Sequence, residues 1–138
     1  MNTKFLVGDV IPKRHFTTTN ISLFLYNAAV WNAHRIHYDE RYTIEVENHP
    51  GIIVDGPLQG DWLTQVAIDW IGQRGVIKEF EYSNRLASVV GEILTGGGEV
   101  VSVRENLVSL KLYLKNSAGQ IITPGSALFE LTVTKLTT

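Results

Sequence analysis

Hydrophobic and polar residues follow two different periods along this chain, helical in the first half and strand-like in the second. Apolar residues recur at helical spacing over residues 20–31, which predicts an amphipathic helix with Thr19 or Asn20 as its N-cap. A run rich in β-branched residues at 13–19 predicts a strand before this helix. Residues 39–46 are expected to form a second, short helix, because acidic residues open the segment.

A longer helix is predicted in the middle of the chain, over about residues 57–73. The β-branched triplet 52–54, followed by Gly56 and a proline, is typical of a strand, a tight turn and a helix start. From Leu58 onward the apolar residues form two neighbouring stripes. That face is too broad for a helix lying on the surface, so we expect this helix to be largely buried.

Strand-like patterns fill the remainder of the chain. Glycine triplet 96–98 and residues 116–119 are expected to form turns between strands. Helices followed by a run of antiparallel strands indicate an α+β fold, with one sheet wrapped around the central helix. The expected strands cover residues 76–86, 89–94, 99–104, 107–115 and 127–135.

Composition narrows the class of protein without identifying it. The chain has 138 residues, a net charge of −2 and no cysteine. This length predicts a single domain, 1–138. The charge argues against nucleic-acid partners, and the lack of cysteine excludes thiolate nucleophiles and sulfur-ligated metals. No apolar run is long enough for a signal peptide or a membrane span, so a cytoplasmic protein without a membrane partner is expected.

Potentially reactive side chains are concentrated in residues 32–39, Asn-Ala-His-Arg-Ile-His-Tyr-Asp. His37 is the best candidate base, because an imidazole exchanges protons near neutral pH. Asn32, His34, Arg35 and Asp39 are close enough in sequence to orient it. The alternative is that these are solvated loop residues, which spacing alone slightly favours. The two histidines lack a positioned third ligand, so no metal site is predicted.

A second candidate feature is the start of the central helix. Gly56 would leave backbone N–H groups free at the positive end of the helix dipole, where they can polarise a carbonyl. The alternative is an ordinary turn into a helix. Asp55 precedes this glycine. Asp61 would lie in the first turn, either as a charge near the cap, which we favour, or as a group facing the substrate.

Together, the segments 32–39 and 49–58, the latter reading His-Pro-Gly-Ile-Ile-Val-Asp-Gly-Pro-Leu, resemble the MaoC-like acyl dehydratases. The similarity is greatest to the branch of mesaconyl-CoA hydratases and dehydratases akin to fungal fatty-acid synthase. That branch typically reads Asn-x-His-Arg-Ile-His-Tyr-Asp and then Tyr-Pro-Gly-Leu-Val-Val-His-Gly-Pro-Leu. The resemblance covers residues 16–63 well and implies a hot-dog fold, assembled as dimers.

The resemblance also implies an activity and the residues that perform it. In the wider family, an aspartate and a histidine hold the water that adds to a 2-enoyl thioester, or act in the reverse dehydration. The histidine corresponds to His37, the aspartate to Asn32, and the glycine that offers its N–H to the thioester carbonyl to Gly56. Two residues depart from the pattern: Asn32 cannot take a proton, and Asp55 replaces the usual histidine. Asp55 could repel the developing enolate or supply the missing acidic group.

Our first hypothesis is therefore a hydro-lyase acting on a 2-enoyl or 3-hydroxyacyl thioester of CoA or a carrier protein. His37, Asn32 and Gly56 are its predicted catalytic residues, and Asp55, Arg35 and Asp61 are candidates for substrate binding. No cofactor or metal is expected, because the thioester itself is the electron sink. One alternative is an acyl-CoA thioesterase that uses Asp55 or Asp61. Another is a catalytically weakened subunit of a hetero-oligomeric dehydratase. We expect a homodimer or higher homo-oligomer, or else a heterodimer with a second hot-dog chain.

Overall fold

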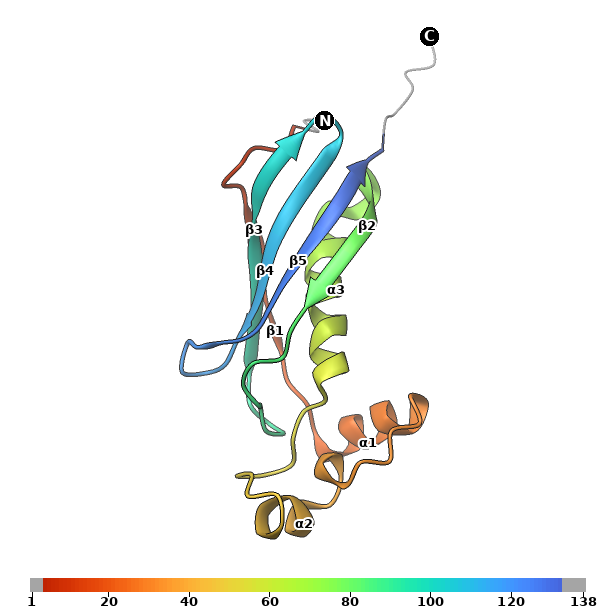
Figure 1. Ribbon diagram of the computed structural model, residues 1–138, viewed down its shortest axis with the longest axis vertical. Coiled ribbons are helices and arrows are strands. Elements are labelled where there is room, and N and C mark those ends of the chain that lie inside the picture. The colour runs from red at the N-terminus through yellow and green to blue at the C-terminus, as the bar shows by residue number, and fades with distance from the viewer. Residues whose placement is uncertain (1–3, 133–138) are drawn as a thin grey trace.

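An antiparallel five-stranded sheet curls around one long helix (Figure 1). The computed structural model describes residues 4–132. Two 3-10 helices, η1 and η2, accompany the main elements. In chain order the elements are β1 (Val10–Phe16), α1 (Asn20–Ala29), η1 (Arg35–His37), α2 (Glu40–Glu45), α3 (Gly56–Ile71), η2 (Gly72–Arg74), β2 (Gly75–Tyr82), β3 (Leu94–Arg104), β4 (Leu107–Lys115) and β5 (Ile121–Leu131).

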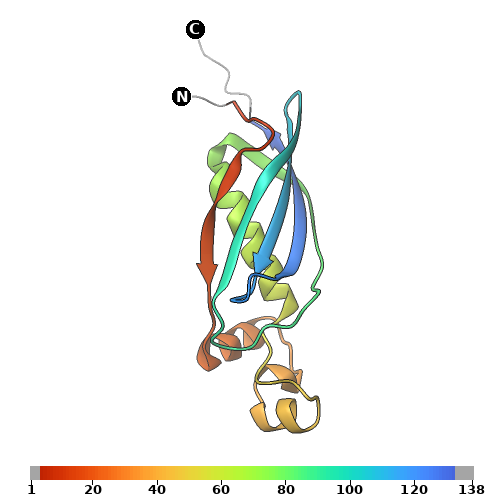
Figure 2. The ribbon, with the colours of Figure 1, turned by 90° about the vertical axis from the view of Figure 1, so that its left-hand side faces the viewer.

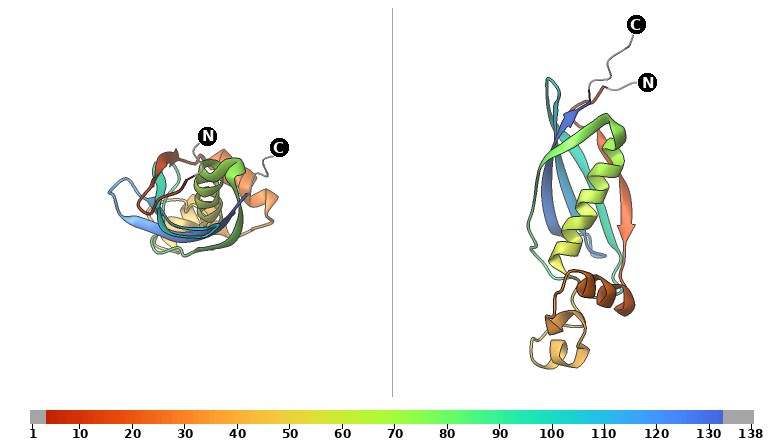
Figure 3. Two further views of the ribbon diagram at one scale, coloured as in Figure 1. Left: turned by 90° about the horizontal axis from the view of Figure 1, so that it is seen from above. Right: turned by 90° about the vertical axis from the view of Figure 1, so that its right-hand side faces the viewer.

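Helix α3 forms the centre of the core, as its two apolar stripes predict. It lies in the concave face of the sheet (Figure 3). Leu63 and Ala67 are completely buried, and Trp62 stacks on Phe16 of β1 at 5.1 Å between ring centroids. Gly72 ends the helix with a φ of 57°, a left-handed conformation that suits glycine. The tryptophans on this helix are therefore core residues and do not form exposed stacking surfaces.

The sheet has the strand order β1-β3-β4-β5-β2, with all neighbours antiparallel. Strand β4 shows the predicted alternation most clearly. Its even-numbered residues 108 to 114 are buried against α3, whereas the intervening residues are partly or fully exposed. This arrangement of one sheet around one helix is the hot-dog fold that the resemblance implies.

Helices α1 and α2 gather at the N-terminal end of α3, outside the curled sheet (Figure 2). Thr19 caps α1 in a reciprocal arrangement with Ser22: each side chain accepts a hydrogen bond from the other's backbone N–H, at 3.0 and 2.8 Å. The α1 and α2 helices predicted from the sequence are thus confirmed.

The orientation of α1 differs from the one its pattern suggests. The expected apolar face is largely exposed: Phe24 is 60 % and Trp31 94 % accessible. The buried residues of this helix are Leu23 and Asn27. The apolar pattern therefore predicted a helix but did not specify which side of it packs inward.

Two predicted strands are wrong. Residues 52–54 and 89–94 were expected as separate strands, yet outside the named strands they share only an isolated bridge between Ile53 and Val89. Their backbones nevertheless pair: Val54 N–H donates to Ser88 at 2.8 Å and Val90 N–H donates to Ile52 at 2.8 Å. Residues 52–54 are buried at the end of the core, and their backbone pairs with residues 88–90 without joining the main sheet.

The glycine triplet is also not a turn. Gly96, Gly97 and Gly98 lie inside β3, paired with β4 on one side. A Cβ on Gly96 would lie 2.9 Å from Val66 of α3, and one on Gly98 would lie 2.4 Å from the Lys111 carbonyl oxygen. Glycines here let helix and strands approach closely, which a local turn pattern does not reveal.

The remaining boundaries shift by a few residues. Strand β1 begins at Val10, earlier than expected, and β5 begins at Ile121, ahead of the predicted 127. Residues 116–119 form the predicted turn. The last residues of the expected strand 127–135 lie outside the described part of the chain. Within residues 4–132, no helix has the length and apolar character needed to cross a membrane.

Candidate active site

A buried carboxylate, that of Asp55, lies where α1, the loop after it and α3 meet. Asp55 is the N-cap residue of α3 and is 1 % accessible. Asn27 donates to its Oδ1 at 2.9 Å, and Asn32 donates to its Oδ2 at 3.2 Å. The His37 Nδ1 atom lies 3.3 Å from Oδ1. Because a buried carboxylate needs partners, these groups and the nearby helix N-terminus stabilise its charge.

The imidazole of His37 is held in one tautomer. Its Nδ1 lies 2.7 Å from the Ile53 carbonyl oxygen, which can only accept a hydrogen bond. Nδ1 therefore carries the hydrogen, and the Nε2 lone pair makes no hydrogen bond within residues 4–132. His37 is 7 % accessible. The arrangement presents Nε2 as a proton acceptor while Asp55 faces the opposite side of the ring.

Local backbone pairing fixes this geometry. The Ile53 N–H donates to the Ile36 carbonyl at 2.9 Å, so the residue that orients His37 is itself bonded to the neighbouring residue of η1. The segment containing Ile53 is in turn bonded to the loop at Ser88 and Val90. The apolar run mistaken for a strand therefore serves as a support for the histidine.

Asn32 lies beside Asp55, as its place in the polar segment suggested. Its Nδ2 donates to Asp55, and its Oδ1 accepts a hydrogen bond from the His34 N–H at 3.1 Å. The amide thus links the carboxylate to the start of the turn that carries His37. The side chains of Asn32, His37 and Asp55, three of the six residues expected to form the site, meet in the structure.

Asn27 belongs to the cluster but was missed by the sequence analysis. It is 4 % accessible, and its Nδ2 also donates to the Leu23 carbonyl at 2.8 Å. Its Oδ1 accepts no hydrogen bond from the described residues, 4–132. Nothing in the sequence indicated it, because the inward side of α1 is not the side on which the apolar residues recur.

Gly56 is the first residue of α3 and follows Asp55 directly. Its backbone N–H makes no hydrogen bond to the part of the chain that the structure describes. The Asn84 side chain packs over this glycine: a Cβ at position 56 would lie 2.4 Å from Asn84 Oδ1. Asn84 Nδ2 also lies 3.4 Å from the Gly56 carbonyl oxygen. Gly56 and Asp55 are therefore adjacent parts of one site, with Asn84 covering it.

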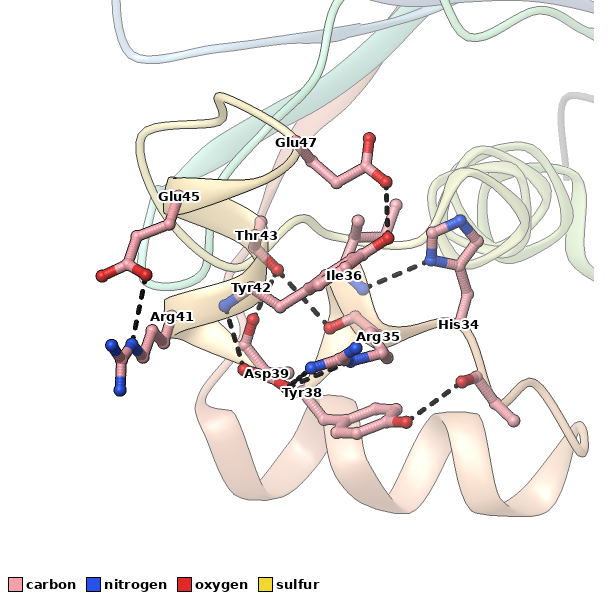
Figure 4. Close-up of polar contacts among 11 residues, drawn as sticks. His34, Arg35, Ile36, Tyr38, Asp39, Arg41, Tyr42, Thr43, Glu45 and Glu47 are labelled. Atoms are coloured by element: carbon pink, nitrogen blue, oxygen red, sulfur yellow. Dashed lines mark hydrogen bonds and ion pairs between the residues drawn. The ribbon is translucent and has the colours of Figure 1, made fainter.

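Arg35 does not join the cluster (Figure 4). Its guanidinium donates to Asp39 at 2.8 Å and lies 4.0 Å from the Tyr42 ring centroid. The hydrogen bond to Asp39 raises the pKa of Arg35. Its contacts therefore connect η1 to α2, which is a structural role.

The placement of Asp61 in the first turn of the central helix is wrong, because α3 begins at Gly56 and has no acidic residue in its first turn. Asp61 is exposed further along α3 and faces Tyr26 of α1. Burial raises the pKa of Tyr26 to about 12, and the carboxylates of Asp61 and Asp55 add to the effect. The phenol therefore stays neutral between the two acids. Asp61 makes no hydrogen bond to Asn27, Asn32 or His37 within residues 4–132.

No group of three or more His, Cys, Asp and Glu side chains within residues 4–132 could hold a metal ion. The cluster consists of one carboxylate, one imidazole and two amides, which are suited to hydrogen bonding and proton transfer.

Comparisons with known proteins identify the family to which the chain belongs. A family model described as hydroxyacyl-thioester dehydratase type 2 matches residues 7–90. The mitochondrial hydroxyacyl-thioester dehydratase type 2 of Schizosaccharomyces pombe is 44 % identical over 57 residues, which is 40 % of this chain and 19 % of that protein. The mesaconyl-C(4)-CoA hydratase of Chloroflexus aurantiacus is 47 % identical over 45 residues, 33 % of this chain and 16 % of that protein. The chain thus aligns with about a fifth or less of these relatives' length.

Among solved structures, the ChsH1-ChsH2 complex from Mycobacterium tuberculosis superposes with a TM-score of 0.83 at 18 % identity. The match covers 92 % of this chain and 98 % of that one. At such low identity the similarity establishes the fold alone. The family model, in contrast, spans more than half of the sequence and includes the whole cluster. This chain therefore belongs to the hydroxyacyl-thioester dehydratase type 2 family.

Proposed function

We propose that this protein is a hydro-lyase that adds water to a 2-enoyl thioester or removes it from a 3-hydroxyacyl thioester. The observation that carries the proposal is the state of His37: its Nδ1 is bonded to Ile53, and its Nε2 lone pair has no hydrogen-bond partner among residues 4–132. A fixed imidazole beside a buried carboxylate is a suitable general base. The family and the names of both curated relatives support the same reaction class.

In the hydration direction, His37 Nε2 takes a proton from water while the water oxygen bonds to C3 of the enoyl group. The C2–C3 π electrons move toward the thioester carbonyl, giving an enolate. The Gly56 N–H, at the positive end of α3, stabilises the negative oxygen. The proton on Nε2 is then delivered to C2, and dehydration is the reverse. The thioester serves as the electron sink, so the proposal invokes no cofactor.

Asp55 supplies the negative charge that this mechanism needs. When Nε2 takes the proton, the ring becomes an imidazolium, and the carboxylate 3.3 Å from Nδ1 stabilises that cation. The amides of Asn27 and Asn32 hold the carboxylate on the Nδ1 side of the ring. Asn32 also orients the water in this proposal. We therefore propose that Asp55 stabilises the protonated form of His37, and that it neither repels the enolate nor binds the substrate.

The test is to follow the loss of enoyl absorbance when purified protein is mixed with crotonyl-CoA. His37→Ala should lower kcat by about 10²–10⁴-fold, the usual contribution of a general base. His15→Ala is the matched control, because His15 is exposed on β1. Within residues 4–132 its imidazole is hydrogen-bonded to the Thr95 hydroxyl and to no other side chain. Equal activity of His37→Ala and wild type would contradict the assignment.

A thioesterase remains the second candidate function, because a buried carboxylate lies next to Gly56. Only Asp55 has the required position, since Asp61 is exposed and faces Tyr26. The two reactions give different products: hydration keeps the thioester intact, whereas hydrolysis releases a free thiol. Thiol release from butyryl-CoA, which has no double bond to hydrate, would favour the thioesterase.

The assembly and location are also proposals. The exposed apolar side of α1 supports an oligomer, either of this chain or with a second hot-dog chain. One structure of similar fold is described as a complex of ChsH1 and ChsH2. Sedimentation measures the mass of the particle, first for this chain alone and then for this chain co-expressed with a second hot-dog chain. An oligomer of the chain alone indicates a homo-oligomer, and one that forms only on co-expression indicates a hetero-oligomer. We keep the cytoplasm as the proposed location, although the Schizosaccharomyces pombe relative is named as mitochondrial. Imaging of a tagged chain tests this.

A further inference from the structure

A hollow of about 320 Å³ lies on the outer face of the sheet, away from α3. Strand register places it there. Thr95 of β3 pairs with Lys115 of β4, and the odd-numbered residues of β4 point away from the buried row 108 to 114. Helix α3 occupies the opposite, concave face (Figure 3). No residue of the Asp55 cluster lines the hollow, so it is separate from the candidate active site.

Two lysines that line this hollow have no acidic partner. Lys13, on the edge strand β1, makes no ion pair within residues 4–132. The Lys115 side chain contacts only an aromatic ring in that part of the chain, with its Nζ 4.6 Å from the Tyr113 ring centroid. In contrast, Arg14 and Lys78 are paired with carboxylates. Two unpaired ammonium groups around one hollow repel each other, and an anion bound between them removes that repulsion.

The Tyr113 side chain adds an unused hydroxyl to the same hollow. Its ring lies across β3 at Gly97, where a Cβ would lie 2.5 Å from the Tyr113 hydroxyl oxygen. Within the described range, 4–132, this hydroxyl makes no hydrogen bond. A phenolic O–H can donate to an anion. The hollow therefore combines two cations with a neutral donor.

The turn that forms one wall of the hollow is held in place by its own side chains. Asn116 Oδ1 accepts hydrogen bonds from the backbone N–H groups of residues 118 and 120, at 3.1 and 2.9 Å. The Ser117 hydroxyl donates to Glu92 at 3.0 Å, but Glu92 itself does not line the hollow. Of the residues that the structure describes, no carboxylate lines it. The site is therefore preformed and has a positive lining.

We propose that this hollow binds the phosphate group of a small molecule, outside the active site. Lys13 and Lys115 supply the charge, and the Tyr113 hydroxyl donates a hydrogen bond. Lysine is a common phosphate ligand, and the volume lies at the low end of the range for small-molecule pockets, about 300–1,000 Å³. The nearby His15 imidazole is hydrogen-bonded to Thr95 at 3.2 Å and is not assigned to the anion. The proposal does not depend on the hydro-lyase activity.

Isothermal titration of the whole chain with sodium pyrophosphate tests the site. We expect saturable binding, tighter than that of inorganic phosphate because pyrophosphate carries more charge. Lys13→Gln and Lys115→Gln should each weaken pyrophosphate binding by about tenfold, the usual effect of losing one charge-assisted hydrogen bond. Tyr113→Phe should weaken it by about threefold. Absence of saturable binding up to about 10 mM pyrophosphate would overturn the proposal.

Lys111→Gln is the matched control for these variants. Lys111 is exposed on the same face of β4 as Lys115, and it does not line the hollow. The control removes the same charge from the chain, so its pyrophosphate affinity should stay within about twofold of wild type. If Lys111→Gln weakens binding as much as Lys115→Gln, the effect is one of overall charge and the proposal is wrong. Urea unfolding of each variant without ligand verifies that the fold is intact.

The phosphate could belong to a free metabolite or to the CoA part of a thioester, and competition distinguishes these sources. Butyryl-CoA carries phosphates, whereas butyryl-pantetheine carries the same acyl group without them. Displacement of pyrophosphate by butyryl-CoA alone would support the site and identify CoA as the source. Displacement by neither thioester would support a separate phosphate compound. Displacement by butyryl-pantetheine would place the pyrophosphate at the acyl site and overturn the proposal. None of these titrations measures hydration, so the hydro-lyase is tested independently.

Discussion

The Asp55 carboxylate lies 3.3 Å from Nδ1 of His37, on a histidine whose tautomer is already set by the Ile53 carbonyl at 2.7 Å. Charge and orientation are therefore supplied by different groups. In a triad where one carboxylate does both, removal of its charge also disturbs the tautomer. Here the two effects can be separated by substitution.

Asp55→Asn should lower kcat for crotonyl-CoA by roughly 10²-fold, within the range of general base catalysis, with a smaller effect on KM. The reason is loss of the charge that stabilises the imidazolium, since the Ile53 carbonyl still fixes the ring. Asp55→Glu should recover part of the activity. Steady-state kinetics of both variants makes the check, and an Asp55→Asn enzyme as fast as wild type would show that the carboxylate has no part in the reaction.

Asn32→Asp should destabilise the protein by about 1–3 kcal/mol, because it replaces a donor 3.2 Å from Asp55 with a second acceptor. The double variant Asn32→Asp/Asp55→Asn restores one donor and one acceptor at this contact. It should therefore regain stability relative to Asn32→Asp in urea unfolding. The double variant moves the carboxylate from position 55 to position 32. If catalysis needs the charge beside His37, kcat of the double variant stays low although the protein is stable. Additive losses of stability in the double variant would mean that the two side chains are not coupled.

Asn27→Leu should cost about 1–3 kcal/mol of stability and reduce kcat, because it removes the donor to Asp55 Oδ1 from a buried position. The control is Gln65→Leu, an exposed position on α3. Its effect should stay within about 0.5 kcal/mol. Thermal unfolding and crotonyl-CoA kinetics measure both. The role assigned to Asn27 fails if its replacement is as mild as the control.

Two adjacent glycines of β3 should respond differently to alanine. A Cβ at Gly98 would meet the backbone oxygen of Lys111 at 2.4 Å, which can move only with the sheet. A Cβ at Gly97 would meet the Tyr113 hydroxyl at 2.5 Å, at the far end of a side chain that can swing away. Gly98→Ala should therefore cost about 1–3 kcal/mol in urea unfolding, and Gly97→Ala clearly less. The reverse order would contradict the close strand packing described here.

Asp39 should contribute stability that is lost in acid. The backbone N–H of Tyr42, followed by Arg35, holds the pKa of this carboxyl below its ordinary value. Its folded pKa is thus lower than its unfolded pKa. The stabilisation is present above the unfolded pKa, about 4, and disappears as the pH falls through the folded value. Melting temperatures of wild type and Asp39→Asn should differ at pH 7 and converge toward pH 3. A constant difference would exclude this linkage.

The sequence by itself determined the elements that depend on local periodicity and capping. The two stripes after Leu58 specified a buried central helix, the alternation in 107–115 specified a strand, and the pair Thr19 and Asn20 located the start of α1 to within one residue. These features arise from residues close in sequence, whose side-chain spacing is fixed by helix or strand geometry. The polar segment and Gly56 were also visible as motifs.

The tertiary structure decided which of those polar residues meet. Asn27 and Asp55 are 28 positions apart, and their contact depends on how α1 docks at the end of α3. The same docking turned the expected apolar face of α1 outward, and close packing placed the glycine triplet within a strand. Arg35 was a candidate for substrate binding in the sequence, but its ion pair with Asp39 holds it in another network. Such outcomes depend on long-range packing, which no local pattern encodes. Only the fold could therefore bring Asp55 to His37.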